Sequence, residues 1–238
     1  MDVSIVIPIR DEAENIRPLA VEIASAMDRD RLSWECIWVD DGSTDGSLPL
    51  LKALSDIDGR HRYISFERNC GQSAAFWAGF KNARGPMIAT IDGDGQNDPA
   101  DIPELLRIVQ SGSADMANGY RARRQDGLKR KISSLVANGF RNWMTGRTVR
   151  DVGCSTRVFR KECVEYLPLF SGMHRFLPTL VALQGFRLAE FPVNHRPRMK
   201  GKSKYSINNR LWVGLADTFG VYWLQRRAFQ CKIRDRSS

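Results

Sequence analysis

The chain has 238 residues, enough for one large α/β domain or two small ones, and 42% of them are hydrophobic, which excludes a disordered chain. The net charge of +9 hides an asymmetry, because residues 1–115 carry 11 basic and 20 acidic side chains, whereas residues 116–238 carry 25 and 7. An acidic half suits a metal-dependent site, and a basic half suits phosphate, anionic lipid or nucleic acid.

Two further features narrow the class of protein. No apolar run reaches the roughly 18–20 residues needed to span a bilayer, since the longest candidate, 211–224, is shorter and carries Asp217. Residues 1–10 start directly with a strand pattern, so we expect no signal peptide. Five scattered cysteines without a C-x-x-C pair favour free thiols in a reducing compartment over disulfides or a zinc site.

Strands and helices alternate along the first half of the chain. Apolar runs predict strands at 3–8, 34–39, 62–66 and 87–91. Helical spacing predicts helices from near Glu12 to near Met27, and at 47–55, 72–84 and 99–109. Pro18 is compatible with the first of these helices only in its first turn. This alternation predicts a mainly parallel sheet with flanking helices.

Polar side chains follow all four of these strands. They are Arg10, Asp11 and Glu12 after the first strand, Asp40 and Asp41 after the second, Asn69 after the third, and Asp92 and Asp94 after the fourth. In open parallel sheets, ligands bind beyond the carboxyl ends of the strands. We therefore expect a binding site at this edge of the sheet.

The fourth strand ends in two carboxylates one residue apart. Alternate side chains of an extended chain point the same way, so Asp92 and Asp94 can converge on one point. A Mg²⁺ or Mn²⁺ ion would relieve their repulsion and could bridge them to substrate phosphates. Such spacing also occurs in surface turns, and Asp40 and Asp41 could simply cap the next helix, so the prediction depends on the combination of motifs.

Two segments of the basic half combine apolar stripes with positive charge. Residues 128–148 fit a helix with Leu128 and Trp143 on its apolar stripe, and residues 207–229 carry several aromatic side chains before two arginines. Basic amphipathic helices with Trp and Tyr suit the interface of an anionic membrane. Packing against the core or against another subunit explains the same stripes. A homo-oligomer is therefore an alternative explanation.

Seven motifs in matching order, from about residue 3 to residue 210, resemble family 2 glycosyltransferases of the GT-A fold, and more narrowly the dolichyl- and undecaprenyl-phosphate sugar transferases. The motifs are Pro8-Ile9-Arg10-Asp11-Glu12, Asp40-Asp41-Gly42-Ser43, Asn69-Cys70-Gly71-Gln72, Asp92-Gly93-Asp94-Gly95-Gln96, Gly119-Tyr120-Arg121, Asp151-Val152-Gly153-Cys154 and Gly201-Lys202-Ser203-Lys204-Tyr205. Arg10 and Asp11 replace the commoner Tyr and Asn of that family. Many bacterial members also carry transmembrane helices after this region.

This resemblance implies a Rossmann-like GT-A sheet followed by C-terminal amphipathic helices. Residues 1–115 would form the donor-binding half, 116–210 the acceptor-binding half of the same domain, and 211–238 an amphipathic basic segment. The implied reaction is the inverting transfer of one sugar from a UDP- or GDP-sugar to a polyprenyl phosphate, in cell-envelope glycan or lipid glycosylation. The implied location is cytoplasmic and peripheral, on the cytoplasmic face of an anionic membrane.

The same resemblance assigns roles to individual residues. In such a transfer, negative charge builds on the departing diphosphate, where a Mg²⁺ or Mn²⁺ ion and basic side chains offset it. The expected metal ligands are Asp92, Asp94 and Gln96, and the expected catalytic residues are Asp92, Asp94, Arg121, Arg130 and Lys204. The expected donor-binding residues are Pro8, Arg10, Glu12, Val39, Asp41, Gln72, Asp92, Gly93, Asp94 and Gln96. The acceptor phosphate is expected at Arg121, Arg130, Arg198, Lys200 and Ser203.

Three alternatives remain at this point. A phosphate acceptor is already ionised and needs positioning, whereas a hydroxyl acceptor needs a base, for which Asp151 is the best C-terminal candidate. A processive polysaccharide synthase is disfavoured, because Gln225-Arg226-Arg227-Ala228 departs from the Gln-x-x-Arg-Trp motif of those enzymes. A nucleic-acid-binding module would use the interleaved aromatic and basic residues, but no recognition motif is visible, so we expect no nucleic-acid partner.

Overall fold

The computed structural model describes residues 1–122, 139, 142–144, 146, 149–197 and 207–227, of which 207–213 are described by their backbone alone. The predicted site residues Arg130, Arg198, Lys200, Ser203 and Lys204 lie outside the described residues, as does most of the predicted 128–148 helix. The acidic motifs of the first half all lie within them.

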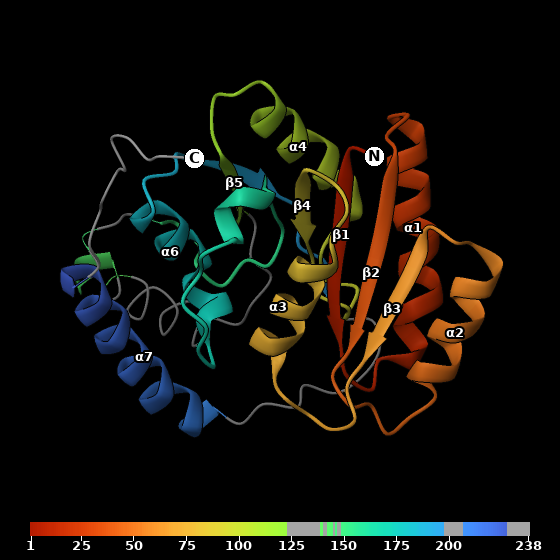
Figure 1. Ribbon diagram of the computed structural model, residues 1–238, viewed down its shortest axis with the longest axis horizontal. Coiled ribbons are helices and arrows are strands. Elements are labelled where there is room, and N and C mark those ends of the chain that lie inside the picture. Colours follow the sequence, from red (N-terminus) through yellow and green to blue (C-terminus); the bar gives the residue numbers. More distant parts are fainter. Residues whose placement is uncertain (123–138, 140–141, 145, 147–148, 198–206, 228–238) are drawn as a thin grey trace, which may run out of the picture.

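A single sheet of seven strands organises the described chain, in the order β3-β2-β1-β4-β6-β5-β7 (Figure 1). The strands are β1 (Val3–Ile9), β2 (Trp34–Asp40), β3 (His61–Ser65), β4 (Met87–Thr90), β5 (Met116–Arg121), β6 (Arg157–Arg160) and β7 (Leu188–Val193). The first four strands run parallel, and β5 is parallel to β7, whereas β6 is antiparallel to both β4 and β5. The predicted α/β class and mainly parallel sheet are confirmed.

Helices cover both faces of this sheet. They are α1 (Ala13–Arg29), α2 (Ser47–Ile57), α3 (Gln72–Asn82), η1 (Pro99–Asp101), α4 (Ile102–Gln110), η2 (Lys161–Val164), η3 (Met173–Phe176), α6 (Leu177–Leu183) and α7 (Ile207–Arg227). Side chains of α1, α2 and α4 form one core with the sheet, and side chains of α3, η3 and α6 form a second core. Every residue of β1 and β2 is buried, as expected for parallel strands covered on both faces.

The helices end within two residues of the sequence prediction, and two of the differences have a structural reason. The first helix begins at Ala13, so Pro18 lies beyond its first turn rather than within it. The third helix ends at Asn82 instead of residue 84, because the chain turns extended at Ala83 to bring Gly85 against the backbone of Ser4. A Cβ atom at Gly85 would lie 3.0 Å from the Ser4 amide nitrogen, so a small residue fits there best.

Candidate active site

The site lies at the carboxyl ends of the parallel strands. In Figure 1 the arrowheads of β1, β2 and β3 all point to the lower edge of the sheet, where the loops after these strands gather. The loops carry four of the acidic and amide motifs that the sequence places after successive strands. The topology therefore brings these motifs to one edge.

Asp41 organises the loop that follows β3. Its carboxylate oxygens accept hydrogen bonds from Asn69 Nδ2 at 2.7 Å, from the Cys70 amide at 2.6 Å and from the Gly71 amide at 3.0 Å. The neighbouring Gly42 has φ +67°, and a Cβ atom there would lie 2.5 Å from the Arg68 carbonyl carbon. The second and third motifs are thus built as one unit, and the role of Asp41 toward a nucleoside stays a prediction.

The first motif is tied to the second in the same way. Asp11, at φ +47°, accepts a 2.6 Å hydrogen bond from the Thr44 amide through Oδ1 and donates its own amide to Ser43 Oγ at 2.8 Å. The Glu12 amide donates to Ser47 Oγ at 3.1 Å. Among the other predicted donor-binding residues, Arg10 is exposed beside this junction, whereas Pro8 and Val39 are buried inside the strands.

Asp92 is clamped from two sides. Its Oδ1 accepts a 2.8 Å hydrogen bond from Gln72 Nε2 of α3, and its Oδ2 accepts a 2.6 Å hydrogen bond from Ser155 Oγ. Asn97 closes the loop, because its Oδ1 accepts hydrogen bonds from the Asp92 amide at 2.9 Å and from Ser155 Oγ at 3.1 Å. The carboxylate orientation is therefore fixed before any ligand arrives.

Asp94 and Gln96 lie at the turn that follows. The Gln96 amide donates to Asp94 Oδ1 at 3.1 Å, and Gln96 Nε2 donates to the Arg196 carbonyl at 3.3 Å. The Arg196 guanidinium in turn pairs with Glu22 at 2.7 Å and with Asp98 at 2.8 Å. The segment after β7 is thereby held against the paired carboxylates.

The donor set fits a hard divalent cation that takes further ligands from a substrate. Burial raises the pKa of Asp92, and the Asp94 carboxylate raises it further, so a cation would relieve a real repulsion here. Within the described part of the chain, no group of three or more His, Cys, Asp or Glu side chains could hold a metal alone. Two carboxylates match Mg²⁺ or Mn²⁺ completed by phosphate oxygens.

Arg121 ends β5 and forms a two-point ion pair. Its Nε donates to Asp151 Oδ2 at 2.6 Å, and its Nη2 donates to Asp151 Oδ1 at 2.9 Å. The Asp151 side chain is 5% exposed and that of Arg121 is 17% exposed. Such a fork fixes the guanidinium plane as well as its position. Asp151, the candidate base of the alternative reaction, is thus engaged with an arginine.

A buried carboxylate next to the site predicts a pH-dependent stability. Burial raises the pKa of Asp101 to about 6, although the Asn194 amide donates to its Oδ2 at 2.8 Å. The folded protein therefore favours the protonated form. The contribution of Asp101 to stability is fully present below a pH of about 4, the ordinary pKa of aspartate, and is lost as the pH rises through 6.

We expect Asp101→Asn to cancel this dependence, because asparagine cannot ionise and still accepts from the Asn194 amide. Between pH 4 and pH 7, the free energy of unfolding of the variant should gain on the order of 2 kcal/mol relative to the wild type. Urea titrations at the two pH values measure this difference. Asp56→Asn, an exposed change on α2, is the matched control and should show no such gain. An equal difference at both pH values for Asp101→Asn contradicts the assignment.

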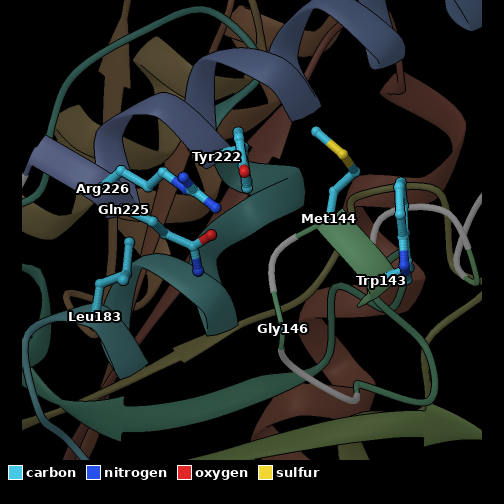
Figure 2. A pocket seen from close by; sticks show the side chains of 7 residues that line it. All are labelled: Trp143, Met144, Gly146, Leu183, Tyr222, Gln225 and Arg226. Atoms are coloured by element: carbon cyan, nitrogen blue, oxygen red, sulfur yellow. The ribbon is translucent and has the colours of Figure 1, made fainter.

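A separate groove of about 640 Å³ lies beside α7 and shares no residue with the acidic site. In Figure 2 the side chains of Tyr222, Gln225 and Arg226 reach it from α7, opposite Trp143 and Met144. The Arg226 guanidinium lies 4.7 Å from the centre of the Tyr222 ring. Trp143 is 76% exposed and Trp223 is 62% exposed, so large apolar side chains face outward on this side.

Sequence reasoning missed the side chains that support the acidic motifs. Ser155, Asn97 and Arg157 contact the motifs or one another, yet none belongs to a periodic pattern. The one available signal was position, because Ser155 directly follows the motif Asp151 to Cys154. The carboxylates and Arg121 were predicted, whereas the clamp around Asp92 was not.

This geometry, with tied acidic loops at the carboxyl edge of an α/β sheet, two carboxylates after β4 and a fixed arginine after β5, agrees with the glycosyltransferase resemblance of the motifs. Residues 4–167 match the family model described as "Glycosyl transferase family 2". The chain belongs to glycosyl transferase family 2, which confirms the resemblance seen in its motifs.

The relatives are polyprenyl-phosphate sugar transferases. The chain is 39% identical over 230 residues to the dodecaprenyl-phosphate galacturonate synthase of Rhizobium johnstonii, covering 95% of this chain and 68% of that protein. It is 36% identical over 206 residues to the undecaprenyl-phosphate 4-deoxy-4-formamido-L-arabinose transferase of Salmonella choleraesuis, covering 86% of this chain and 63% of that protein. The matched region thus spans about two thirds of these relatives.

Solved structures agree on the fold. Glucosyl-3-phosphoglycerate synthase from Mycobacterium tuberculosis, in complex with Mn²⁺, UDP and glucosyl-3-phosphoglycerate, has a TM-score of 0.70 at 18% identity, covering 94% of this chain and 79% of that chain. The same synthase with Mg²⁺ and UDP has a TM-score of 0.68 at 16% identity, with the same coverage. At this identity the likeness concerns the fold.

Proposed function

We propose that the protein transfers one sugar from a nucleotide-sugar donor to a polyprenyl phosphate, with a Mg²⁺ or Mn²⁺ ion held by Asp92 and Asp94. The observation that carries this proposal is the pair of opposite charges at one sheet edge, with fixed carboxylates after β4 and a fixed guanidinium after β5. Relatives at 39% and 36% identity carry polyprenyl-phosphate transferase names. A solved neighbour binds Mn²⁺ and UDP.

Each group has a defined task in this reaction. The bound ion supplies charge stabilisation to the departing diphosphate. Gln72 and Ser155 fix the orientation of Asp92, which with Asp94 would hold the ion, and Asp41 holds the 69–71 loop, where the nucleoside would bind. Arg121, together with the predicted Arg130 and Lys204, balances the phosphate charges. An ionised acceptor phosphate needs no base, in accord with the pairing of Asp151 with Arg121.

The acceptor implies contact with a membrane surface. Among the described helices, none combines the length and the apolar character needed to cross a bilayer. α7 instead presents Phe219 at 55% and Trp223 at 62% exposure, and it ends in the exposed Arg226 and Arg227. Aromatic and basic side chains together suit the headgroup region of an anionic leaflet. We propose a peripheral position on the cytoplasmic face, where nucleotide sugars are made.

A donor panel tests the proposed function. UDP- and GDP-sugars, including uronic acids and amino sugars, are incubated with a short polyprenyl phosphate and Mn²⁺, and the lipid phase is analysed by mass spectrometry. At least one donor should give a glycosylated polyprenyl phosphate, and Asp94→Asn should abolish the product. Donor hydrolysis or transfer to a saccharide, with no lipid product, favours the hydroxyl-acceptor alternative.

We expect binding to vesicles that contain anionic lipid, weakened by salt and much lower on neutral vesicles. Each basic residue at such a surface contributes about 1 kcal/mol, within a Debye length of about 8 Å. Replacing Phe219 and Trp223 by serine should reduce co-sedimentation severalfold. The matched control replaces Val21 and Ile57, which are 69% and 83% exposed on α1 and α2, and should leave it unchanged. Equal loss in both double variants would refute the assignment of this face.

A further inference from the structure

Arg157 is a buried arginine that belongs to none of the seven sequence motifs. The residue is 3% exposed and opens β6, opposite Thr90 of β4, two residues before Asp92. Its Nε donates to Asn118 Oδ1 at 3.0 Å, its Nη1 to the His174 carbonyl at 2.9 Å and its Nη2 to the Val152 carbonyl at 2.9 Å. All three acceptors are neutral, although a buried charge is normally paired with an opposite one.

The opposite charges are the carboxylates of the site. Burial lowers the pKa of Arg157, whereas Cys154, Asp92 and Asp151 act against that shift, and Arg157 in turn lowers the pKa of Asp92. The interaction is electrostatic and acts through space, because the hydrogen bonds to the Asp92 carboxylate come from Gln72 and Ser155. Arg157 therefore acts on Asp92 without occupying its carboxylate oxygens.

The hydrogen bonds of Arg157 also hold the segment that supports the site. Residues 151–155 carry Asp151, which pairs with Arg121, and Ser155, which donates to Asp92. Arg157 fastens this segment at the Val152 carbonyl and joins it to β5 and η3. η3 is in turn fixed to α3, because Ser73 Oγ lies 2.8 Å from His174 Nδ1 and accepts from the Gly172 amide at 2.9 Å.

We propose that Arg157 is a positioning residue that serves as the internal counter-charge of Asp92 while it fixes the 151–155 segment. This inference rests on the proposed metal site but on neither the donor sugar nor the acceptor. The fixed positive charge of Arg157 repels a divalent ion, and it stabilises the carboxylate when no ion is bound. Metal affinity thus reports the charge of Arg157 separately from its hydrogen bonds.

The test is Mn²⁺ titration by calorimetry on folded protein saturated with UDP or GDP, whose phosphate oxygens would complete the site, with no acceptor present. Arg157→Met removes the charge and should bind Mn²⁺ at least about threefold more tightly than the wild type. Arg157→Lys keeps the charge and should bind within about twofold of the wild type, while its kcat falls about tenfold because the fork of hydrogen bonds is lost. Arg160→Met, the same charge change at the far end of β6, is the matched control and should bind like the wild type.

Two results would overturn the proposed role of Arg157. Unchanged or weaker Mn²⁺ binding in folded Arg157→Met would overturn the counter-charge role and leave Arg157 as a structural residue. If Arg157→Met fails to fold, Arg157→Gln carries the same expectation, because its amide still donates to a neutral oxygen. Absence of Mn²⁺ binding in every variant would also overturn the inference. Glycolipid formation in the donor panel is measured separately from Mn²⁺ affinity. Failure of the proposed function and failure of this inference can therefore be told apart.

Discussion

Asp94→Asn is expected to lower kcat by on the order of a hundredfold or more, comparable to the loss of one strong electrostatic stabiliser. Asp94 lies at the turn after β4, where its Oδ1 already accepts from the Gln96 amide, and asparagine preserves that contact. The variant should therefore fold normally and lose only the negative charge that holds the cation. Steady-state transfer rates with saturating donor measure the effect.

The control for this prediction is Asp56→Asn, which removes an exposed aspartate charge on α2. It should leave kcat within twofold of the wild type. Excess EDTA should abolish wild-type activity, and added Mn²⁺ or Mg²⁺ should restore it. Full activity in EDTA, or a normal kcat in Asp94→Asn, would show that the D-x-D motif has a structural role here.

The second large effect is expected at the Arg121–Asp151 pair. Arg121→Ala should lower kcat/KM for a phosphate acceptor by about a hundredfold, because a fixed guanidinium next to phosphate is a strong charge-assisted donor. Asp151→Asn should cost about tenfold, since it loosens Arg121 without removing it. The double variant should be no worse than Arg121→Ala alone, as expected for two residues that act as a unit.

The chain offers a matched control for this cycle just before β5 and β7 begin. Arg187 and Asp115 also form a two-point pair, at 3.2 and 3.3 Å, but at the opposite end of β5. Arg187→Ala and Asp115→Asn should leave kcat/KM close to wild type. If Asp151 were instead a general base, Asp151→Asn would lower kcat more than Arg121→Ala, and the acidic limb of the pH profile would change. That result would promote the hydroxyl-acceptor reaction.

The strands that could be predicted are those with an uninterrupted apolar signal. β1 and β2 are buried at every position, and their alternation with helices was enough to predict a parallel sheet. β5, β6 and β7 were not predicted. β5 contains Asn118, Gly119 and Arg121, and β6 is four residues long with an arginine at each end, so their sequences lack a strand pattern. Their place in the sheet comes from pairing across long sequence separations.

The same distinction holds for the site. The carboxylates at the strand ends could be predicted because parallel topology brings successive loops to one edge. The partners of Asp92 could not, since Ser155 and Asn97 are specified by three-dimensional packing over many intervening residues. The buried Arg157 is the clearest example of a site residue that could not be predicted, because only folding brings its charge next to the site. Local pattern identifies the motifs, and packing decides how they are held.

The most direct test of the proposed function compares two acceptors that share one chain, a polyprenyl phosphate and the corresponding polyprenol. Both are supplied in detergent with Mn²⁺ and the donor selected by the panel, and glycolipid formation is followed by mass spectrometry. A site that binds the acceptor phosphate through Arg121 and needs no base predicts a sugar-linked product from the phosphate, no product from the alcohol, and no product from either with Asp94→Asn. Efficient transfer to the polyprenol, or to neither lipid while a soluble hydroxyl is glycosylated, would contradict it.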